Sequence, residues 1–406
     1  MVMIFILRVL MFYNPINPLD TSPVIHRASS LDLTHWTKEP ERVSLRPGRW
    51  YQDAPSCAWR DPFVFRDPVC GQYVMLITAA TRNGAPAFSG CIAWAVSEDL
   101  EHWTQKPPLY SPGISSGLEM AGMFYEGGRY YLTYCLGELL NVSYRVADRL
   151  EGPYRRPAQD VLSQWFHYGA REFSDGERHF LLPSAWEREA RNDAPGNLWG
   201  NGAYVYAGSS ATVQELAMLP DGSLEVRYPA LLDKVRGASL LGARPFDGLS
   251  AFGGDWRVRA STLSGASEQG AARAMIPAVA SDVWLRCSLR MEGGAAAGLL
   301  LRASQGGERG YLLRLDWDRQ TASLWRYPME WVTARSMAEV RVPGLSRGSR
   351  YEVKVMIHAN LLDAYLDGRH LFSRTVYDHR EGQLGLFVED GTADFSGLEV
   401  FGHAEQ

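Results

Sequence analysis

The stretch Trp59-Arg-Asp-Pro-Phe-Val-Phe65 places a charged pair directly against an apolar, strand-like run. A glycine-containing turn follows, and Tyr73-Val-Met-Leu-Ile77 has the composition of a second strand that returns beside the first. The sequence repeats this plan around Glu119, where Met120-Ala-Gly-Met-Phe-Tyr125 precedes a turn and the run Tyr130-Tyr-Leu-Thr-Tyr134. Two carboxylates at equivalent points of two hairpins are typical of a radially repeated β structure that directs both toward one axis.

A second repeated element is a polar turn that ends in an indole. The segment Ser29-Ser-Leu-Asp-Leu-Thr-His-Trp36 returns as Ser97-Glu-Asp-Leu-Glu-His-Trp103, so the two tryptophans lie 67 residues apart. A third copy, Ala147-Asp-Arg-Leu-Glu-Gly-Pro-Tyr154, lacks the tryptophan. Each copy predicts a turn that ends one strand and presents its ring to the next sheet, so we interpret the repeat as architectural rather than catalytic.

The strand-like segments fall into two groups, and long helical periodicity is absent from the sequence. Residues 1–235 hold short strands separated by turn residues, which predicts an all-β domain of repeated sheets. The repeat breaks between 236 and 255, where we expect a linker. Residues 256–406 hold longer alternating segments, such as Tyr351-Glu-Val-Lys-Val-Met-Ile-His358, and this alternation predicts a two-sheet β-sandwich.

The composition excludes some classes of partner. The 406 residues carry a formal net charge of -5, which argues against nucleic acid, because nucleic-acid binding needs concentrated basic surface. Aromatic residues make up 12% of the chain, which suits sugar-stacking surfaces and core packing equally. The five cysteines are scattered and form no Cys-x-x-Cys pair, so we expect no zinc site, no disulfide framework and a reducing, cytoplasmic location. No His/Asp cluster has ligand spacing, so we predict no metal and no cofactor.

The N-terminal segment Met1-Val-Met-Ile-Phe-Ile-Leu-Arg8-Val-Leu-Met-Phe-Tyr13 has the hydrophobicity of a signal peptide. It has no basic residue before its apolar run, carries Arg8 in the middle and lacks a small-x-small cleavage pattern. It is also too short to span a bilayer. We therefore expect a buried strand and no membrane partner, with secretion only if the true N-terminus lies upstream.

These features together resemble glycoside hydrolase family 32. The resemblance is carried by Trp59-Arg-Asp-Pro-Phe-Val-Phe65, by the flanking Asp-Leu-x-His-Trp turns, by Glu119, and by a sandwich that ends in Gly385-Leu-Phe-Val-Glu-Asp-Gly-Thr-Ala-Asp-Phe-Ser396. It covers almost the whole chain and implies a five-bladed β-propeller over 1–235, with an incomplete first blade, followed by a jelly-roll β-sandwich. The implied activity is hydrolysis of β-fructofuranosides or related furanosides, with a small carbohydrate or oligosaccharide as partner.

The resemblance also implies roles for single residues. Asp61 would stabilise the transition state and hold sugar hydroxyls, with Arg60 beside it, and Glu119 would be the general acid/base. Glycoside cleavage needs one protonated carboxyl for the leaving oxygen and an anionic face toward the oxocarbenium-like ring. Further candidates for sugar binding are Trp59, His167 and Trp186, and core packing is the competing interpretation of each.

The sequence departs from the family pattern at two points. Glu119 precedes Met120-Ala121 where the family has Cys-Pro, and no Asn-Asp-Pro segment of the kind that holds the nucleophile occurs in the chain. Counting back from Arg8 by the spacing of the later hairpins places that segment before Met1. Three hypotheses follow: a truncated product of a retaining hydrolase, an inverting enzyme that uses Glu119 as acid, or a catalytically inactive propeller that binds carbohydrate. A glycoside phosphorylase would need a basic phosphate pocket, which the sequence does not display.

Overall fold

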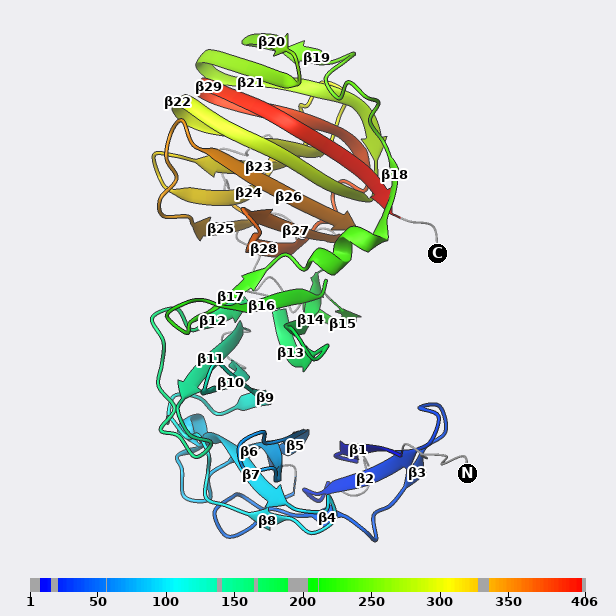
Figure 1. Ribbon diagram of the computed structural model, residues 1–406, viewed down its shortest axis with the longest axis vertical. Coiled ribbons are helices and arrows are strands. Elements are labelled where there is room, and N and C mark those ends of the chain that lie inside the picture. Colours follow the sequence, from blue (N-terminus) through cyan, green and yellow to red (C-terminus); the bar gives the residue numbers. More distant parts are fainter. Residues whose placement is uncertain are drawn as a thin grey trace, which may run out of the picture. The chain divides into compact units, whose positions relative to one another are not determined.

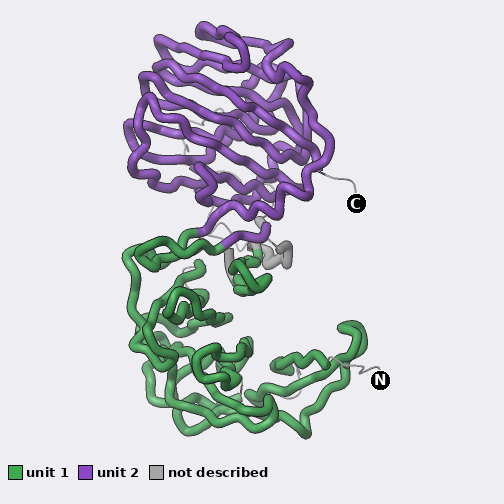
Figure 2. Tube along the Cα trace, viewed as in Figure 1, with its two compact units in different colours: residues 1–184, 216–225 green, residues 185–215, 226–406 purple. Residues whose placement is uncertain are grey.

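The computed structural model describes residues 8–15, 21–55, 57–136, 141–163, 167–188, 204–210, 212–327 and 336–403. Strands dominate these residues, and the 3-10 helices η1 (Pro86–Phe88) and η4 (Ala230–Val235) are short. No helix in this part of the chain is long and apolar enough to cross a bilayer. The chain divides into two compact units, residues 1–184 with 216–225 and residues 185–215 with 226–406 (Figure 2). The all-β prediction is confirmed.

Unit 1 contains three four-stranded antiparallel sheets and the start of a further hairpin (Figure 1). The first sheet holds β1 (Val9–Tyr13), β2 (Ile25–Ser30), β3 (Thr37–Lys38) and β4 (Ser44–Leu45). The second holds β5 (Trp59–Arg66), β6 (Tyr73–Ala80), β7 (Gly90–Ser97) and β8 (Thr104–Gln105). The third holds β9 (Leu118–Glu126), β10 (Arg129–Leu136), β11 (Asn141–Ala147) and β12 (Val161–Ser163). The strands that follow in the chain are β13 (His167–Ser174), β14 (His179–Arg188), β15 (Tyr204–Ser210), β16 (Gln214–Met218) and β17 (Leu224–Arg227). Of these, β13 belongs to unit 1 and β15 to unit 2, and the other three contain residues of both.

The sheets are repeats of one another, with one exception in the first. Strand β5 lies beside β9, and β9 lies beside β13, so the first strand of each later sheet faces the next. The register pairs Val9 with Ser30 in the first sheet and Tyr73 with Ser97 in the second, which makes β1 and β2 the equivalents of β6 and β7. Among the described residues, the first sheet therefore has no equivalent of β5.

The predicted N-terminal strand is present over Val9–Tyr13 as β1, while residues 1–7 lie outside the described part of the chain. Its residues are mostly half-buried, and Met11 is 41% exposed. The expectation of a buried strand was wrong for these residues, because β1 has a partner strand on one side and a partly exposed face.

The repeated polar turns are built alike. Asp99 accepts hydrogen bonds from the N–H groups of Glu101 (2.9 Å) and His102 (2.8 Å), and Asp32 accepts the corresponding pair in the first copy. After the second turn, Trp103 packs edge-on against Phe12 of the first sheet, with ring centroids 5.5 Å apart. The second turn therefore joins the first and second sheets, whereas the indole of Trp36 in the first turn donates to Leu33 O within the turn itself.

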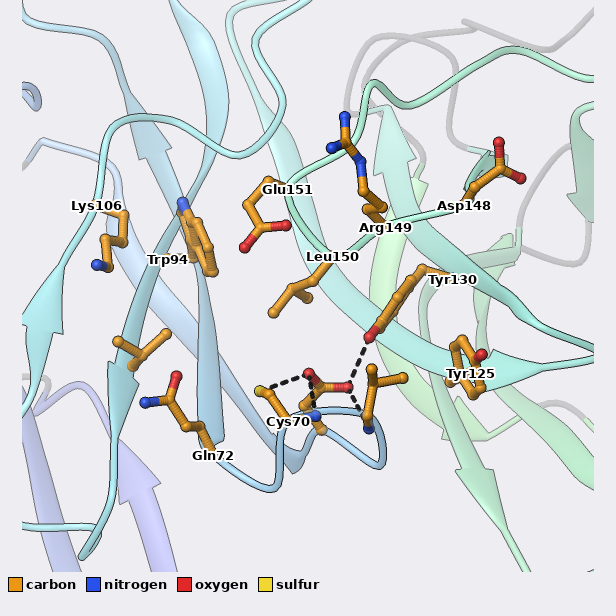
Figure 3. A pocket seen from close by; sticks show the side chains of 13 residues that line it. Cys70, Gln72, Trp94, Lys106, Tyr125, Tyr130, Asp148, Arg149, Leu150 and Glu151 are labelled. Atoms are coloured by element: carbon orange, nitrogen blue, oxygen red, sulfur yellow. Dashed lines mark hydrogen bonds between the residues drawn. The ribbon is translucent and has the colours of Figure 1, made fainter.

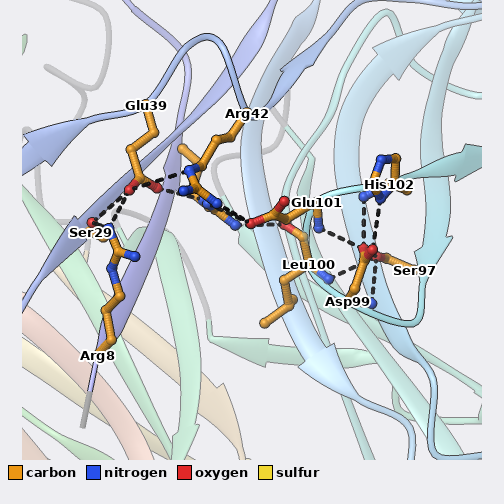
Figure 4. Close-up of polar contacts among 10 residues, drawn as sticks. Arg8, Ser29, Glu39, Arg42, Ser97, Asp99, Leu100, Glu101 and His102 are labelled. Carbon is orange, nitrogen blue, oxygen red and sulfur yellow. Dashed lines mark hydrogen bonds and ion pairs between the residues drawn. The ribbon is translucent and has the colours of Figure 1, made fainter. Parts of the chain in front are cut away.

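A buried ion-pair network lies in the seam between the first and second sheets (Figure 4). Arg27 Nε donates to Glu39 Oε2 at 2.8 Å, and both side chains are buried. Glu101, in the turn of the second sheet, accepts from Arg27 at 3.1 Å and from Arg42 at 2.7 Å. Arg8 also contacts Glu39. Charged side chains of both sheets thus fill this seam.

Unit 2 contains a β-sandwich whose longest strands are β21 (Thr262–Ala280), β22 (Val283–Ala303) and β29 (Gly382–His403). Its core comes from alternate residues of several strands, including Leu285, Leu299, Leu313, Val355 and Leu386, all at most 1% exposed. The remaining strands are β18 (Arg236–Ser239), β19 (Ser250–Phe252), β20 (Asp255–Arg259), β23 (Gly310–Asp316), β24 (Thr321–Tyr327), β25 (Ala338–Arg341), β26 (Arg350–His358), β27 (Leu361–Leu366) and β28 (Arg369–Thr375).

The predicted linker at 236–255 contains strands of this sandwich. Strand β18 pairs with β29, and β19 pairs with β21. The second unit also begins at Val226 rather than after 235, and it includes 185–215, which the sequence had placed in the propeller. The short, glycine-rich strands of this region lack the repeat pattern of the first unit and were therefore mistaken for a connection.

Candidate active site

Asp61 lies in a β-bulge near the start of β5. Arg60 pairs with Thr78 and Phe63 pairs with Leu76, so β5 has one more residue than β6 across this interval. Asp61 adopts a φ of 58°, in the left-handed region that Asp tolerates better than most residues. Pro62 follows it, and a bulge is one of the few places where a strand accepts proline. The bulge therefore turns the Asp61 carboxylate out of the regular alternation of the strand.

Strand β9 contains the same bulge, with a different residue at its centre. Glu119 pairs with Cys135 and Gly122 pairs with Thr133, and Met120 has a φ of 52°. Met120 is therefore the equivalent of Asp61, and Glu119 is the equivalent of Arg60. The predicted equivalence of the two carboxylates was wrong by one position.

The error came from the turns. In the second sheet, Arg66 pairs with Tyr73, whereas Tyr125 pairs with Tyr130 in the third, so the first of these turns is two residues longer. Counting along the sequence from the tyrosines therefore shifted the alignment of the two bulges. Asp61 and Glu119 still lie at the same end of neighbouring strands.

The bulges are linked from sheet to sheet by backbone N–H groups. The Asp61 N–H donates to Asn14 Oδ1 at 3.4 Å, and the Met120 N–H donates to Thr78 Oγ1 at 3.1 Å. Asn14 directly follows β1, and by register it is the equivalent of Thr78 on β6. Each of these two bulges is thus held by a polar side chain of the preceding sheet, Asn14 at the end of β1 or Thr78 on β6.

A third link of this kind involves Cys135 of β10 and the start of β13. Cys135 is the equivalent of Thr78, because Cys135 faces Glu119 as Thr78 faces Arg60. Burial raises the pKa of the Cys135 thiol to about 11, and hydrogen bonding to the backbone of Ala170 and Gly169 acts in the opposite direction. Gly169 has a φ of 63°, so it takes the position of Asp61 and Met120 in the next strand.

One guanidinium joins the two candidate catalytic carboxylates. Arg60 Nη2 forms an ion pair with Glu119 Oε1, and Arg60 Nε lies 3.5 Å from Asp61 Oδ2. The side chains of Arg60, Asp61 and Glu119 are 39%, 24% and 19% exposed, so all three remain accessible to a ligand. Because both carboxyl groups contact the same planar group, they lie within the separation of up to about 9.5 Å that paired glycosidase carboxyls show.

The Thr78 hydroxyl group orients the Asp61 carboxylate. Thr78 Oγ1 donates to Asp61 Oδ2 at 3.1 Å, while its oxygen accepts the N–H of Met120. Thr78 therefore orients the Asp61 carboxylate and fixes the neighbouring bulge with the same hydroxyl group.

Arg171 of β13 contributes a second cation, which was not among the residues predicted from the sequence. Its Nη1 donates to Ala121 O at 3.2 Å and its Nη2 donates to Asp61 O at 3.3 Å. Burial lowers the pKa of Arg171, and the negative charge of Asp61 opposes that shift. Arg171 therefore ties the backbones of both bulges to the third inner strand. Hydrogen bonds to backbone carbonyls leave no motif in the sequence, and only the glycine at 169 marks this strand as another copy of the bulge.

The remaining residues predicted to bind sugar are Trp59, His167 and Trp186. Trp59 is 2% exposed, packs against Tyr51 and donates its indole N–H to Leu45 O at 2.9 Å, so its assignment as a substrate contact was wrong. Trp59 is a core residue at the start of β5. His167 begins β13 and Trp186 lies in β14, but the side chains of both fall outside the described ones.

No group of three or more His, Cys, Asp or Glu side chains in the described part of the chain has the arrangement of a metal site. The chemistry available in this region comes from Asp61 and Glu119 with Arg60 between them. Two carboxyls at this separation can divide the roles of proton donor and stabilising anion, which is the pairing that glycoside cleavage needs.

Comparisons with solved structures give the fold. A sucrose-6-phosphate hydrolase from Lactobacillus gasseri matches 98% of this chain and 76% of its own, with 14% identity and a TM-score of 0.67. An exo-inulinase from Aspergillus awamori matches 98% and 80%, with 14% identity and a TM-score of 0.67. A family 32 β-fructofuranosidase from Bombyx mori matches 98% and 77%, with 14% identity and a TM-score of 0.62.

No protein-family model and no curated protein matches the sequence itself. The similarity to the solved structures is therefore one of fold. At that level the predicted resemblance to glycoside hydrolase family 32 is confirmed, and the fold class is that of a five-bladed β-propeller followed by a β-sandwich.

Proposed function

We propose that this chain is a glycoside hydrolase that acts on β-fructofuranosides or related furanosides. The observation that carries the proposal is the contact of Arg60 with both Asp61 and Glu119, in adjacent bulges of a propeller. Solved proteins of similar fold include a sucrose-6-phosphate hydrolase and an exo-inulinase, which supports a sugar substrate of this class.

In this proposal Glu119 is the general acid and Asp61 stabilises the positive charge that develops on the sugar ring. Glu119 must hold a proton to serve as the acid, yet in the structure it is paired with the Arg60 guanidinium. Bound substrate would have to separate them, with sugar hydroxyls taking the place of Glu119 on Arg60. Thr78 keeps Asp61 aligned during that exchange, because its hydrogen bond does not involve Arg60.

A carbohydrate-binding protein without turnover is the second candidate. It is favoured by the lack of an Asn-Asp-Pro segment in the sequence and by the first sheet, whose described residues hold no equivalent of β5. Retaining hydrolysis needs a carboxylate nucleophile, whereas inversion needs a base that activates water. Both functions would use the same cluster of Arg60, Asp61 and Glu119 to hold sugar hydroxyls.

Turnover of sucrose, 1-kestose, inulin and nitrophenyl arabinofuranoside distinguishes the two functions. For the hydrolase we expect release of free sugar, with a loss of about 10²- to 10⁴-fold in kcat for Glu119→Gln, as for removal of a general acid. Glu126→Gln is the matched control, since Glu126 ends the same strand and is 52% exposed. If the unmodified protein binds these sugars but releases no free sugar, it is a binding protein. If Glu119→Gln is as active as the unmodified protein, Glu119 is not the general acid.

A further inference from the structure

A cavity of about 360 Å³ lies between the second and third sheets, away from the candidate active site. Asp61 is near the start of β5, whereas the cavity is lined by Asp67, in the turn after the last residue of that strand. Figure 3 shows Trp94 on one side of the cavity and Tyr130 on the other, with Glu151 between Trp94 and Arg149. The volume falls in the range of about 300–1,000 Å³ that is typical of small-molecule pockets.

The repeat explains why this seam is open. With the 67-residue offset of the polar turns, Trp94 is the equivalent of Arg27 and Lys106 is the equivalent of Glu39. In the seam between the first and second sheets, Arg27 and Glu39 form the central buried ion pair. In the seam between the second and third sheets, an indole and a lysine occupy their places, and no ion pair joins them.

The polar turn of the third sheet has an acidic residue at the same position as the turn of the second sheet. In the aligned turns Ser97–Thr104 and Ala147–Tyr154, Glu151 is the equivalent of Glu101, which pairs with two arginines in the first seam. Within the described part of the chain, the side chains of Glu151, Lys106 and Arg149 make no hydrogen bond or ion pair. Three charged groups at the edge of this cavity are therefore available to a ligand.

The walls of the cavity are fixed by contacts of their own. Asp67, which is 2% exposed, accepts from Tyr130 Oη at 2.8 Å and from Cys70 Sγ at 2.7 Å. The indole N–H of Trp94 donates to Pro107 O at 2.8 Å. Because these groups are already bonded, the two rings are held in place without a ligand, and the cavity is preformed.

We propose that this cavity is a second binding site, for a small neutral carbohydrate of one or two sugar rings. A ligand here has to donate hydrogen bonds to Glu151 and accept them from Lys106 or Arg149, and each hydroxyl group of a sugar does both. The apolar face of a sugar ring packs on an aromatic side chain, and the half-buried Tyr125 lines this cavity beside the more deeply buried Trp94 and Tyr130. The proposal does not depend on turnover at Asp61 and Glu119.

The test uses the full chain with Glu119→Gln, which prevents turnover, and titrates it calorimetrically with fructose, sucrose and 1-kestose. We expect binding that persists in Glu119→Gln and weakens at least about tenfold in Glu151→Gln and in Lys106→Met, as for the loss of a hydrogen bond to a charged group. Glu177→Gln, an exposed change in the β13–β14 turn, is the control and should bind as before.

A double substitution provides a further test of the proposed site. Trp94→Arg with Lys106→Glu installs the ion pair of the first seam beside Glu151. The new guanidinium should pair with Glu151 and abolish sugar binding, and thermal unfolding of each variant separates this from misfolding. Sugar binding that is unaffected by the Glu151 and Lys106 changes would overturn the proposal. So would binding lost in Asp61→Asn alone, saturation by glycine in place of sugars, or no binding at millimolar sugar.

Discussion

At the scale of single residues, the candidate site depends on groups that serve two neighbours at once. Arg60 contacts two carboxylates, Thr78 both donates to Asp61 and accepts from Met120, and Arg171 donates to carbonyl groups of two bulges. Loss of one such group leaves several partners without a hydrogen bond. The energetic cost therefore exceeds that of one contact, because unsatisfied buried groups are penalised individually.

Arg171→Met tests this for the backbone of the bulges. The change removes the guanidinium that donates to Ala121 O and Asp61 O, and we expect a loss of about 1–3 kcal/mol in the free energy of unfolding for these part-buried hydrogen bonds. If the protein is a hydrolase, kcat should fall more than KM rises, and Arg171→Lys should recover part of it. Urea unfolding and steady-state kinetics measure both effects. Arg178→Met, on an exposed ion pair in the same hairpin, should cost less than about 1 kcal/mol; a similar cost for both would contradict the role of Arg171.

Asp67 gives a prediction for the effect of pH. Burial alone would raise the pKa of Asp67, but hydrogen bonds from Cys70, Tyr130 and the Val69 N–H lower it below its ordinary value. A carboxyl whose pKa is lower in the folded state stabilises the fold fully above the unfolded pKa of about 3.9, and this contribution is lost as the pH falls through the folded pKa.

Asp67→Asn should therefore reduce the free energy of unfolding at pH 7 and make it fall less steeply below about pH 4 than in the unmodified protein. Urea unfolding at both pH values measures the difference. Asp148→Asn, at a position 64% exposed, is the control and should leave the pH dependence unchanged. An equal slope in Asp67→Asn and the unmodified protein would show that Asp67 does not contribute.

At the scale of sheets and turns, the same repeated framework encloses two different seams. The seam between the first and second sheets is filled by the pair of Arg27 and Glu39, and the equivalent seam of the next sheet holds a cavity beside Trp94. Sheets of a propeller need packed contacts with their neighbours, but the chemistry of those contacts is free to vary from seam to seam. Where the buried ion pair of one seam is replaced by other residues in the next, the space beside them can hold a ligand.

Glu39→Gln tests the filled seam. It removes the buried carboxylate that pairs with Arg27 and leaves the guanidinium with Glu101, which is 34% exposed, so we expect a loss of about 3 kcal/mol in the free energy of unfolding, the lower end for a broken buried pair. Replacing both partners, as Arg27→Met with Glu39→Leu, should cost much less, because no uncompensated charge remains. Denaturant unfolding of the variants measures this, with Glu101→Gln as a milder control at a position 34% exposed. A single change as mild as the double change would show that the pair is not isolated from water.

At the scale of the whole molecule, two compact units with separate cores share one chain. Leu313→Ala in the sandwich core should cost about 2–5 kcal/mol and lower the unfolding temperature of that unit. Leu132→Ala, fully buried in the third sheet, should do the same for unit 1. Differential scanning calorimetry of both variants checks the prediction, and a shift of every transition by either change would contradict independent cores.

The sequence predicted the sheets, the turns and the pair of Asp61 and Glu119, because strand alternation and the Asp-Leu-x-His-Trp turns are local patterns. It could not give the equivalence of Glu119 with Arg60, since that depends on turn lengths that only strand pairing reveals. The burial of Trp59 and the carbonyl contacts of Arg171 are tertiary facts. The same limit explains why 236–255 was taken for a linker, because strands as short as β19 have little periodicity.

The unequal turns of the β5–β6 and β9–β10 hairpins have a practical consequence. One turn is two residues longer than the other, yet both hairpins keep the same pairing up to their bulges. The tip of such a hairpin thus absorbs extra chain without disturbing the opposite end. An affinity epitope or a fluorescent reporter inserted between Glu126 and Arg129 would sit where added length is tolerated, and the β9–β10 turn is the natural place for protein engineering to begin.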